Sequence, residues 1–228
     1  MKKLGFLVAI MLASSAFMAT EVMASDWTGP YAGLQAGYIW GDADTYGWQK
    51  GEGYGFDIKG FQVDGWVGGI YGGYMWQFGN DMLIGLEGEW NWPSADDKIT
   101  IHEVWEGGSG DWGATIEQKW DASLRLNAGK QMGDYMLYVT GGFAWSETAV
   151  YGFKTWEGGQ KDSNSAKLAG WTIGAGAEKK INENIHARIQ YRYSDYGSKT
   201  WVVQTDDINR GKVEHTNHML TVGVSYCF

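Results

Sequence analysis

Large apolar residues alternate with small or polar residues along much of the chain, which is the two-residue period of a β-strand. The last segment shows this most clearly. Leu220, Val222, Val224, Tyr226 and Phe228 share one face, and Thr221, Gly223, Ser225 and Cys227 share the other. Strict alternation of this kind predicts a strand that presents one face to an apolar medium.

Eight segments carry this pattern, at about 31–41, 64–78, 84–92, 121–129, 135–146, 167–180, 185–193 and 217–228. Three connections, at 79–81, 132–134 and 182–184, are tight and rich in Gly, Asn and Asp, as turns are. The other four, at about 42–63, 93–116, 147–166 and 197–216, are read as long loops. Short turns on one side and long loops on the other predict an all-β fold, an eight-stranded antiparallel up-and-down transmembrane β-barrel.

A soluble eight-stranded barrel has the same strand count but places its apolar residues inside. Here the apolar face also carries Trp or Tyr near the long-loop end of nearly every strand. These residues are Trp40, Trp66, Trp90, Trp92, Trp120, Trp145, Trp171 and Tyr193. Such a belt is typical of a membrane–water interface, so we expect these eight residues to form an aromatic girdle that faces outer-membrane lipid.

The opposite face of three strands carries charged residues: Glu87, Glu89, Arg125, Arg188 and Arg192. An eight-stranded barrel is just wide enough for its own side chains to fill it, and unpaired buried charge costs several kcal/mol. We therefore expect these residues to form a lumen charge network with at least one Glu–Arg pair across the lumen. The alternative is a gated narrow pore.

The N-terminus has the three parts of a secretory signal peptide. Lys2 and Lys3 are basic, an apolar stretch runs to about Ala19, and the small residue Ala24 closes a cleavage site. We expect a signal peptide at 1–24 and an outer-membrane barrel domain at 25–228. Beyond this segment, the chain holds no run of 18 apolar residues, as a membrane-spanning helix would require.

Composition narrows the remaining functions. The chain has 35 Gly and 14 Trp among 228 residues, which suits strands better than helices, and its net charge of −9 argues against nucleic acid as a partner. The single cysteine, Cys227, excludes an internal disulfide. We expect it to face the lumen and to be inert.

The chain resembles the small eight-stranded outer-membrane β-barrel family, OmpA-like in architecture, and most of all the porin-like surface proteins of α-proteobacteria. The resemblance rests on four stretches, at 27–33 (WTGPYAG), 72–79 (GGYMWQFG), 84–89 (IGLEGE) and 222–228 (VGVSYCF). It implies that Tyr226 and Phe228, on the terminal strand, form the signal that the barrel-assembly machinery reads. A basic or polar residue would be more usual than Cys227 at its position.

Other chemistry is disfavoured by its context. Glu87 and Glu89 share one strand face, as a pair of acid–base carboxylates would, but the pattern predicts no cleft, so we do not expect an enzyme. Some members of the family bind haemin, which keeps His102, His215 and His218 as candidate ligands. Their spacing matches no metal site, and we interpret them as surface histidines and expect no cofactor.

The loops are acidic and rich in tryptophan. Trp48, Trp105, Trp112, Trp156 and Trp201 either anchor an unknown extracellular ligand or host surface, or pack loop against loop. The main expectation is a structural surface protein that supports the envelope and presents loops. The alternatives are a narrow channel for ions or small solutes and a surface protein that binds haem or another ligand.

Overall fold

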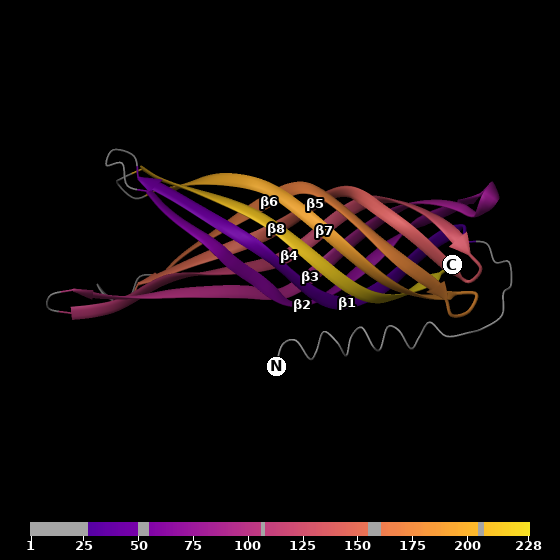
Figure 1. The fold of residues 1–228 in the computed structure, drawn as a ribbon, viewed down its shortest axis with the longest axis horizontal. Coiled ribbons are helices and arrows are strands. Elements are labelled where there is room, and N and C mark those ends of the chain that lie inside the picture. Colours follow the sequence, from indigo (N-terminus) through magenta and orange to yellow (C-terminus); the bar gives the residue numbers. More distant parts are fainter. Residues whose placement is uncertain (1–26, 50–54, 106–107, 155–160, 205–207) are drawn as a thin grey trace.

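Eight antiparallel strands close into one barrel in the computed structural model (Figure 1). They are β1 (Gly29–Gln49), β2 (Gly55–Phe78), β3 (Met82–Trp105), β4 (Gly108–Met132), β5 (Tyr135–Lys154), β6 (Lys161–Lys180), β7 (Ile185–Gln204) and β8 (Ile208–Cys227). A single 3-10 turn, η1 (Gly79–Asp81), links β2 to β3. The structure describes residues 27–49, 55–105, 108–154, 161–204 and 208–228.

Each strand pairs with its neighbours in sequence, and β1 pairs with β8 to close the sheet. The closing ladder runs from the pair Tyr31 and Cys227 to the pair Gln49 and Asn209. Toward the end of the barrel opposite the C-terminus, the β2–β3 ladder stops at Asp64 and Asp96, and the β6–β7 ladder stops at Trp171 and Asp195. From there to the other end every described strand is paired on both sides, which is the condition for a sheet to cross a lipid bilayer. The predicted fold class is confirmed.

The three short connections are also confirmed. They lie at η1, at 133–134 and at 181–184, at the barrel end where β8 finishes and the C-terminus lies (Figure 1). Gly133 adopts a positive φ of 68°, a conformation that glycine takes at little cost and that this turn needs. We call this the turn end of the barrel, and the opposite end the hairpin end.

The prediction of four long loops is wrong, because the strands continue through most of the residues expected to form these loops. β1 and β2, for example, stay paired as far as Trp48 and Gly55, well inside the expected loop 42–63. Alternation is a signal only where the two faces of a strand meet different media. Beyond the membrane both faces meet water, so the ladder continues without the pattern that would have revealed it.

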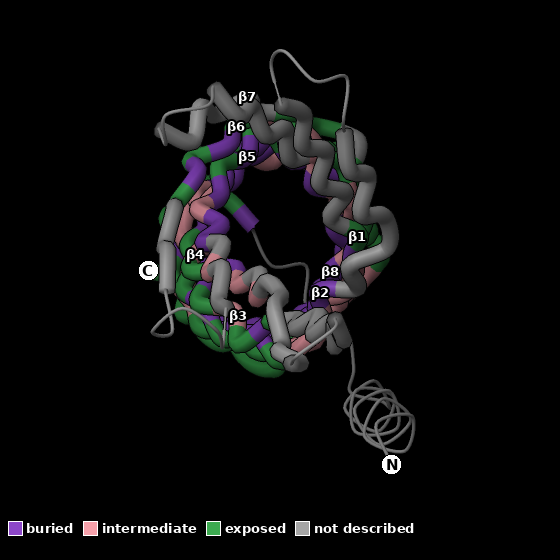
Figure 2. Tube along the Cα trace, turned by 90° about the vertical axis from the view of Figure 1, so that its left-hand side faces the viewer, coloured by how far each residue is buried: buried purple, intermediate pink, exposed green. Residues whose placement is uncertain are grey.

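Buried and exposed residues alternate along the described strands, as the purple and green segments of Figure 2 show in the view along the barrel. On β4, the inward residues Arg125 and Asn127 are 1% and 3% exposed. Leu124 and Leu126, which alternate with them, are 46% and 62% exposed. At the level of these residues, the outer surface is therefore apolar and the lumen polar. Among the described residues no helix has the length and apolarity to cross a membrane.

Candidate functional site

A layer of charged side chains fills the middle of the lumen. β3 supplies Glu87 and Glu89, β4 supplies Arg125, and β7 supplies Arg188 and Arg192. All five point inward because each lies in the inward phase of its strand, and none is more than 6% exposed. The structure thus brings together the five residues of the expected network.

Glu87 is held from three strands. It lies directly opposite Arg125 in the β3–β4 register and forms an ion pair with it. From β7, Arg188 Nη1 lies 2.8 Å from Glu87 Oε2, and the hydroxyl of Tyr31 donates a hydrogen bond of 2.8 Å to the same oxygen. The Arg188 pair joins strands on different sides of the lumen.

Glu89 is the common partner of all three arginines. Its Oε2 lies 2.5 Å from Arg125 Nη2 and 3.6 Å from Arg188 Nη2, and its Oε1 lies 3.2 Å from Arg192 Nη1. Asn91 Nδ2 donates a hydrogen bond of 2.6 Å to Oε1. With Glu87 already in place, the five charges would leave the layer one positive charge in excess.

The missing negative charge belongs to Asp121, which is not among the residues predicted for the network from the sequence. Arg192 forms an ion pair with it, the hydroxyl of Tyr196 donates a hydrogen bond to it, and Asn91 Nδ2 donates another of 2.8 Å. The signal was available, because Asp121 shares the inward phase of Ser123 and Arg125 on β4. With Asp121 included, three carboxylates balance three guanidinium groups.

Uncharged groups on β1 and β2 complete the layer. Gln35 accepts a 2.6 Å hydrogen bond from Arg188 Nη2 and donates one of 2.7 Å to Asn91. The guanidinium carbon of Arg188 lies 3.3 Å from the centre of the Tyr71 ring, a cation–π contact. β1 and β2 therefore each contribute a partner to Arg188, which fixes this long side chain in place.

An apolar cluster fills the lumen between the charged layer and the turn end. Its buried members are Trp27, Tyr31, Tyr71, Met75, Leu83, Met136 and Tyr138. Tyr31 and Tyr71 belong to both levels, since each also contacts a charged residue of the layer. On the hairpin side of the layer, a smaller cluster contains Ala144, Ala166, Leu168 and Tyr196.

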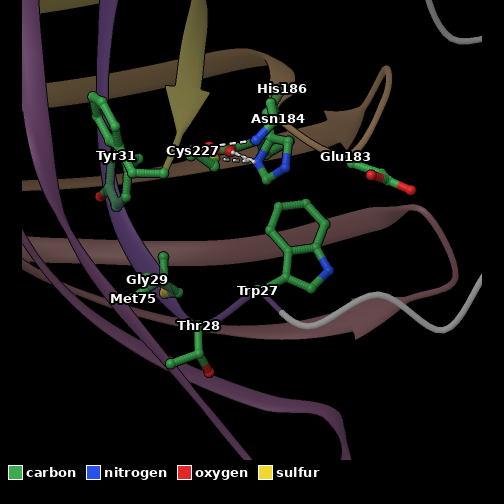
Figure 3. A pocket seen from close by; sticks show the side chains of 11 residues that line it. Trp27, Thr28, Gly29, Tyr31, Met75, Glu183, Asn184, His186 and Cys227 are labelled. Atoms are coloured by element: carbon green, nitrogen blue, oxygen red, sulfur yellow. Dashed lines mark hydrogen bonds and ion pairs between the residues drawn. The ribbon is translucent and has the colours of Figure 1, made fainter.

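A small cavity of about 90 Å³ lies beside the apolar cluster at the turn end. Figure 3 shows Trp27 next to His186, whose ring centres are 4.7 Å apart, with Cys227 on the other side of the imidazole. Cys227 Sγ lies 3.3 Å from His186 Nδ1, and Glu178 Oε1 lies 2.9 Å from the same nitrogen. Cys227 is half-buried and packs against the apolar cluster, on the inner side of the wall as expected.

The interpretation of His215 as a surface histidine is wrong. Its side chain is 1% exposed inside the barrel and stacks on Tyr196, with ring centres 5.4 Å apart. His218 faces outward and stacks on Trp40, so the two histidines lie on opposite faces of β8. Within the described part of the chain, no His, Cys, Asp or Glu residues are grouped to hold a metal ion.

The remaining loop candidates lie outside the residues that the structure describes in full. Trp156 is in an undescribed connection, and the side chains of His102, Trp48, Trp105, Trp112 and Trp201 lie outside the described set. Their roles stay predictions.

The eight residues of the expected girdle all lie on the outward face, and several contact one another across neighbouring strands. Trp90 stacks on Trp120 with ring centres 4.8 Å apart, and Trp171 lies 5.5 Å from Tyr193. The indole nitrogen of Trp120 also donates a 2.8 Å hydrogen bond to Glu147. Trp66 is 59% exposed and Trp92 is 54% exposed, as rings that face lipid are.

Tyr226 and Phe228 also face outward, at the turn end of β8. They are 49% and 74% exposed, and their rings lie 5.1 Å apart in an edge-to-face arrangement. Both rings are therefore available on the outer surface of the wall. Their role as an assembly signal stays a prediction.

Comparison with known proteins identifies the family to which this barrel belongs. Residues 5–228 match the family model described as the outer membrane protein beta-barrel domain. The chain belongs to this outer-membrane β-barrel family. Its location is accordingly the outer membrane, as predicted.

Relatives in the family agree with that location. The chain is 30% identical to a 25 kDa outer-membrane immunogenic protein of Brucella abortus over 203 residues, covering 89% of this chain and 79% of the relative. It is 30% identical to a 31 kDa outer-membrane immunogenic protein of Brucella melitensis, covering 97% of both chains. A 22 kDa outer membrane protein of Rhizobium leguminosarum is 31% identical, with coverage of 86% of this chain and 80% of the relative.

Solved structures share the fold at much lower identity. The outer membrane protein OprG of Pseudomonas aeruginosa superposes with a TM-score of 0.53 at 14% identity, covering 90% of this chain and 98% of OprG. The outer membrane protease OmpT of Escherichia coli also gives 0.53, at 10% identity, covering 92% of this chain and 100% of OmpT. At these identities, the likeness is one of barrel fold alone.

Proposed function

We propose that the protein is a structural component of the outer-membrane surface, with a lumen closed to bulk solution. The observation that carries the proposal is the charged layer. Its six charged side chains, from β3, β4 and β7, are each at most 2% exposed, and ion pairs join β7 to β3 and β4 across the lumen. An ion that entered would have to separate these pairs and would also meet the apolar cluster at the turn end.

The relatives support a surface role. Two of them are named as outer-membrane immunogenic proteins, and we take that description to support a role at the surface for this chain as well. In barrels of this kind, short turns face the periplasm and the longer connections face the exterior. On that basis the hairpin end is extracellular, and the proposed role includes no catalysis.

A narrow channel is the second candidate, and one observation favours it. Several guanidinium nitrogens of the layer have no hydrogen-bond partner within the protein, namely Arg125 Nε and Nη1, Arg188 Nε and Arg192 Nε. Buried polar groups are normally satisfied, so water molecules in the layer would account for them. A continuous file of such waters would make the lumen conductive.

Conductance in planar bilayers separates the two candidates. We expect purified wild-type protein to give no steady current above that of the bare membrane. A variant that empties part of the charged layer and part of the apolar cluster, E89A/R192A/M75A/M136A, should conduct, whereas L126A on the outer face of the same barrel should stay silent. Steady conductance by the wild type would replace the sealed-scaffold proposal with the channel.

We also propose that 1–24 is removed on export, because it has the charge and apolar pattern of a signal peptide. The intact mass of protein purified from outer membranes tests this directly. A mature chain that begins at Ser25 is expected, and a chain that retains Met1 would contradict the proposal.

A further inference from the structure

Toward the hairpin end, the sheet divides into two parts. The β2–β3 ladder stops at Asp64 and Asp96, and the β6–β7 ladder stops at Trp171 and Asp195, although all four strands continue. The other ladders run on toward the strand ends, so the projecting strands form two four-stranded arms. The first arm has the order β2-β1-β8-β7 and the second has the order β3-β4-β5-β6. Figure 1 shows the two arms diverging at the end opposite the C-terminus.

Each arm has two edge strands. Among the described residues, 55–63 of β2, 97–105 of β3, 161–170 of β6 and 198–204 of β7 have ladder partners on one side only. The backbone groups of a strand point alternately to its two sides, so each edge leaves a row of N–H and C=O groups without a strand partner. Beyond the girdle, water can bond to these groups, but such a row is also a template for a further strand.

Three of the four edges carry features that hinder the addition of a strand. The register shifts within the ladder of β2 with β1 and within the ladder of β7 with β8, so both of these edges are bulged. In the β7 bulge, Gly197 adopts a positive φ of 63°. The β6 stretch 161–170 (KDSNSAKLAG) consists largely of poor strand formers, and lysines such as its two commonly protect an edge.

The edge of β3 is regular by comparison. Its ladder with β4 runs from Ala95 to Trp105 without a register shift. The stretch 97–105 (DKITIHEVW) contains no glycine or proline, and four of its residues are Ile, Thr or Val, which favour strands. Lys98 is its only lysine. This edge is therefore the one most open to strand pairing.

We propose that the free edge of β3 at 97–105 binds an extended segment of another polypeptide as an added strand. A row of backbone donors and acceptors at strand spacing is matched by the backbone of a second strand, which bonds through its main chain. The segment that fits best is rich in β-branched residues and free of proline. The inference rests on the proposed extracellular position of the hairpin end, which makes the partner a polypeptide outside the cell.

A strand peptide of simple sequence tests the proposal. Full-length mature protein in detergent micelles is titrated with the synthetic peptide KTVTVTVTK and, separately, with KTPTPTPTK, which has the same charge but cannot form a strand. We expect the first peptide to bind at least about tenfold more tightly, a difference that one or two backbone hydrogen bonds provide. On binding, amide hydrogen exchange should slow in 97–105 and stay unchanged in 161–170.

Proline variants of β3 locate the binding edge. The N–H groups of Thr100 and Ile101 point to opposite sides of the strand, so either T100P or I101P removes a donor from the free edge while the ladder with β4 is kept. That variant, recognised by unchanged exchange in 109–116 of β4, should bind KTVTVTVTK about tenfold more weakly than the wild type. S165P, on the edge of β6, is the matched control and should bind as the wild type does. The gel shift between heated and unheated samples verifies that each variant is folded.

Three outcomes would overturn the proposal. Equal binding of the two peptides would show that side-chain contacts hold them, and full binding by both β3 variants would place the peptide elsewhere. Protection of 97–105 that rises with protein concentration in the absence of peptide would assign the edge to a second copy of this chain. Binding to purified protein does not depend on orientation in the cell, which antibody labelling of intact cells tests separately.

Discussion

Asp121 alone determines whether the charged layer in the lumen is neutral. The five charges evident from alternation leave an excess of one arginine, and the aspartate restores neutrality by pairing with Arg192. Its buried oxygens also accept hydrogen bonds from Tyr196 and Asn91. The charged residues of the layer therefore stabilise one another. We expect the removal of one charge to destabilise the barrel more than the removal of both members of an ion pair.

A double-mutant cycle on Glu87 and Arg125 measures this dependence. Each single variant, E87Q or R125Q, leaves a buried charge without its directly opposed partner and should lower the free energy of unfolding by about 3 kcal/mol. The double variant should lose less than the sum of the two, because it removes both charges together. Urea unfolding in lipid vesicles provides the measurement.

The exposed pair between Lys119 and Glu117 is the control for that cycle, since about 0–1 kcal/mol is expected from a solvent-exposed ion pair. Additive losses at Glu87 and Arg125 would show that the two side chains act independently and that water already screens the layer.

Polar or charged substitutions should destabilise the barrel more at outward positions than at lumen positions. Leu124 is 46% exposed on the lipid face of β4. We therefore expect L124R to destabilise the barrel folded in vesicles by about 2–4 kcal/mol. N127S, at a lumen position of the same strand, should be tolerated far better. Equal losses at the two positions would mean that the faces of β4 are misassigned.

At the scale of the strand, the sequence predicted the parts of the strands that span the membrane but not their continuations toward the hairpin end. Alternation located all eight strands and assigned Leu124 and Arg125 to opposite faces, because lipid and lumen differ sharply in polarity. It ended β7 near Tyr193, although the strand continues to Gln204. Tyr196, which spans the lumen to Asp121, lies in that continuation and so went unrecognised.

The connection between β5 and β6 should be reachable from outside the cell. An epitope tag inserted between residues 157 and 158 should be labelled by antibody on intact cells, because β5 ends and β6 begins at the hairpin end of the barrel. The same tag placed after Gly133, in the turn between β4 and β5, should be labelled only after the membrane is permeabilised. Labelling of the second variant alone would reverse the orientation.

At the scale of the whole molecule, the barrel has a membrane-spanning part and a part that projects beyond the girdle. β3 has 24 residues and β4 has 25, well above the 9–11 that a tilted transmembrane strand needs. The closed sheet, the short turns and the inward charges were predictable, because each follows from a local pattern. The long projections and the partners of each arginine depend on register and on contacts across the lumen, which no local pattern contains.

Amide hydrogen exchange should distinguish the two parts. Peptides that cover the projecting ends, such as 98–105 of β3, should exchange faster in lipid vesicles than peptides that cover 84–91 of the same strand. Backbone hydrogen bonds that border water open locally at lower free energy than those enclosed by lipid and by a packed lumen. Uniform protection along β3 would instead indicate that the projecting part is as rigid as the spanning part.

The distribution of charge along the chain bears on how the barrel assembles. The β3–β4 hairpin brings Glu87, Glu89, Asp121 and Arg125 to the layer, a surplus of two negative charges, and β7 brings Arg188 and Arg192, a surplus of two positive charges. Before closure, the two halves therefore attract each other across the forming lumen. A β7 displaced by one residue would turn its arginines toward lipid and leave the hairpin's surplus buried without a counterpart. We therefore expect the layer to favour the correct register during assembly.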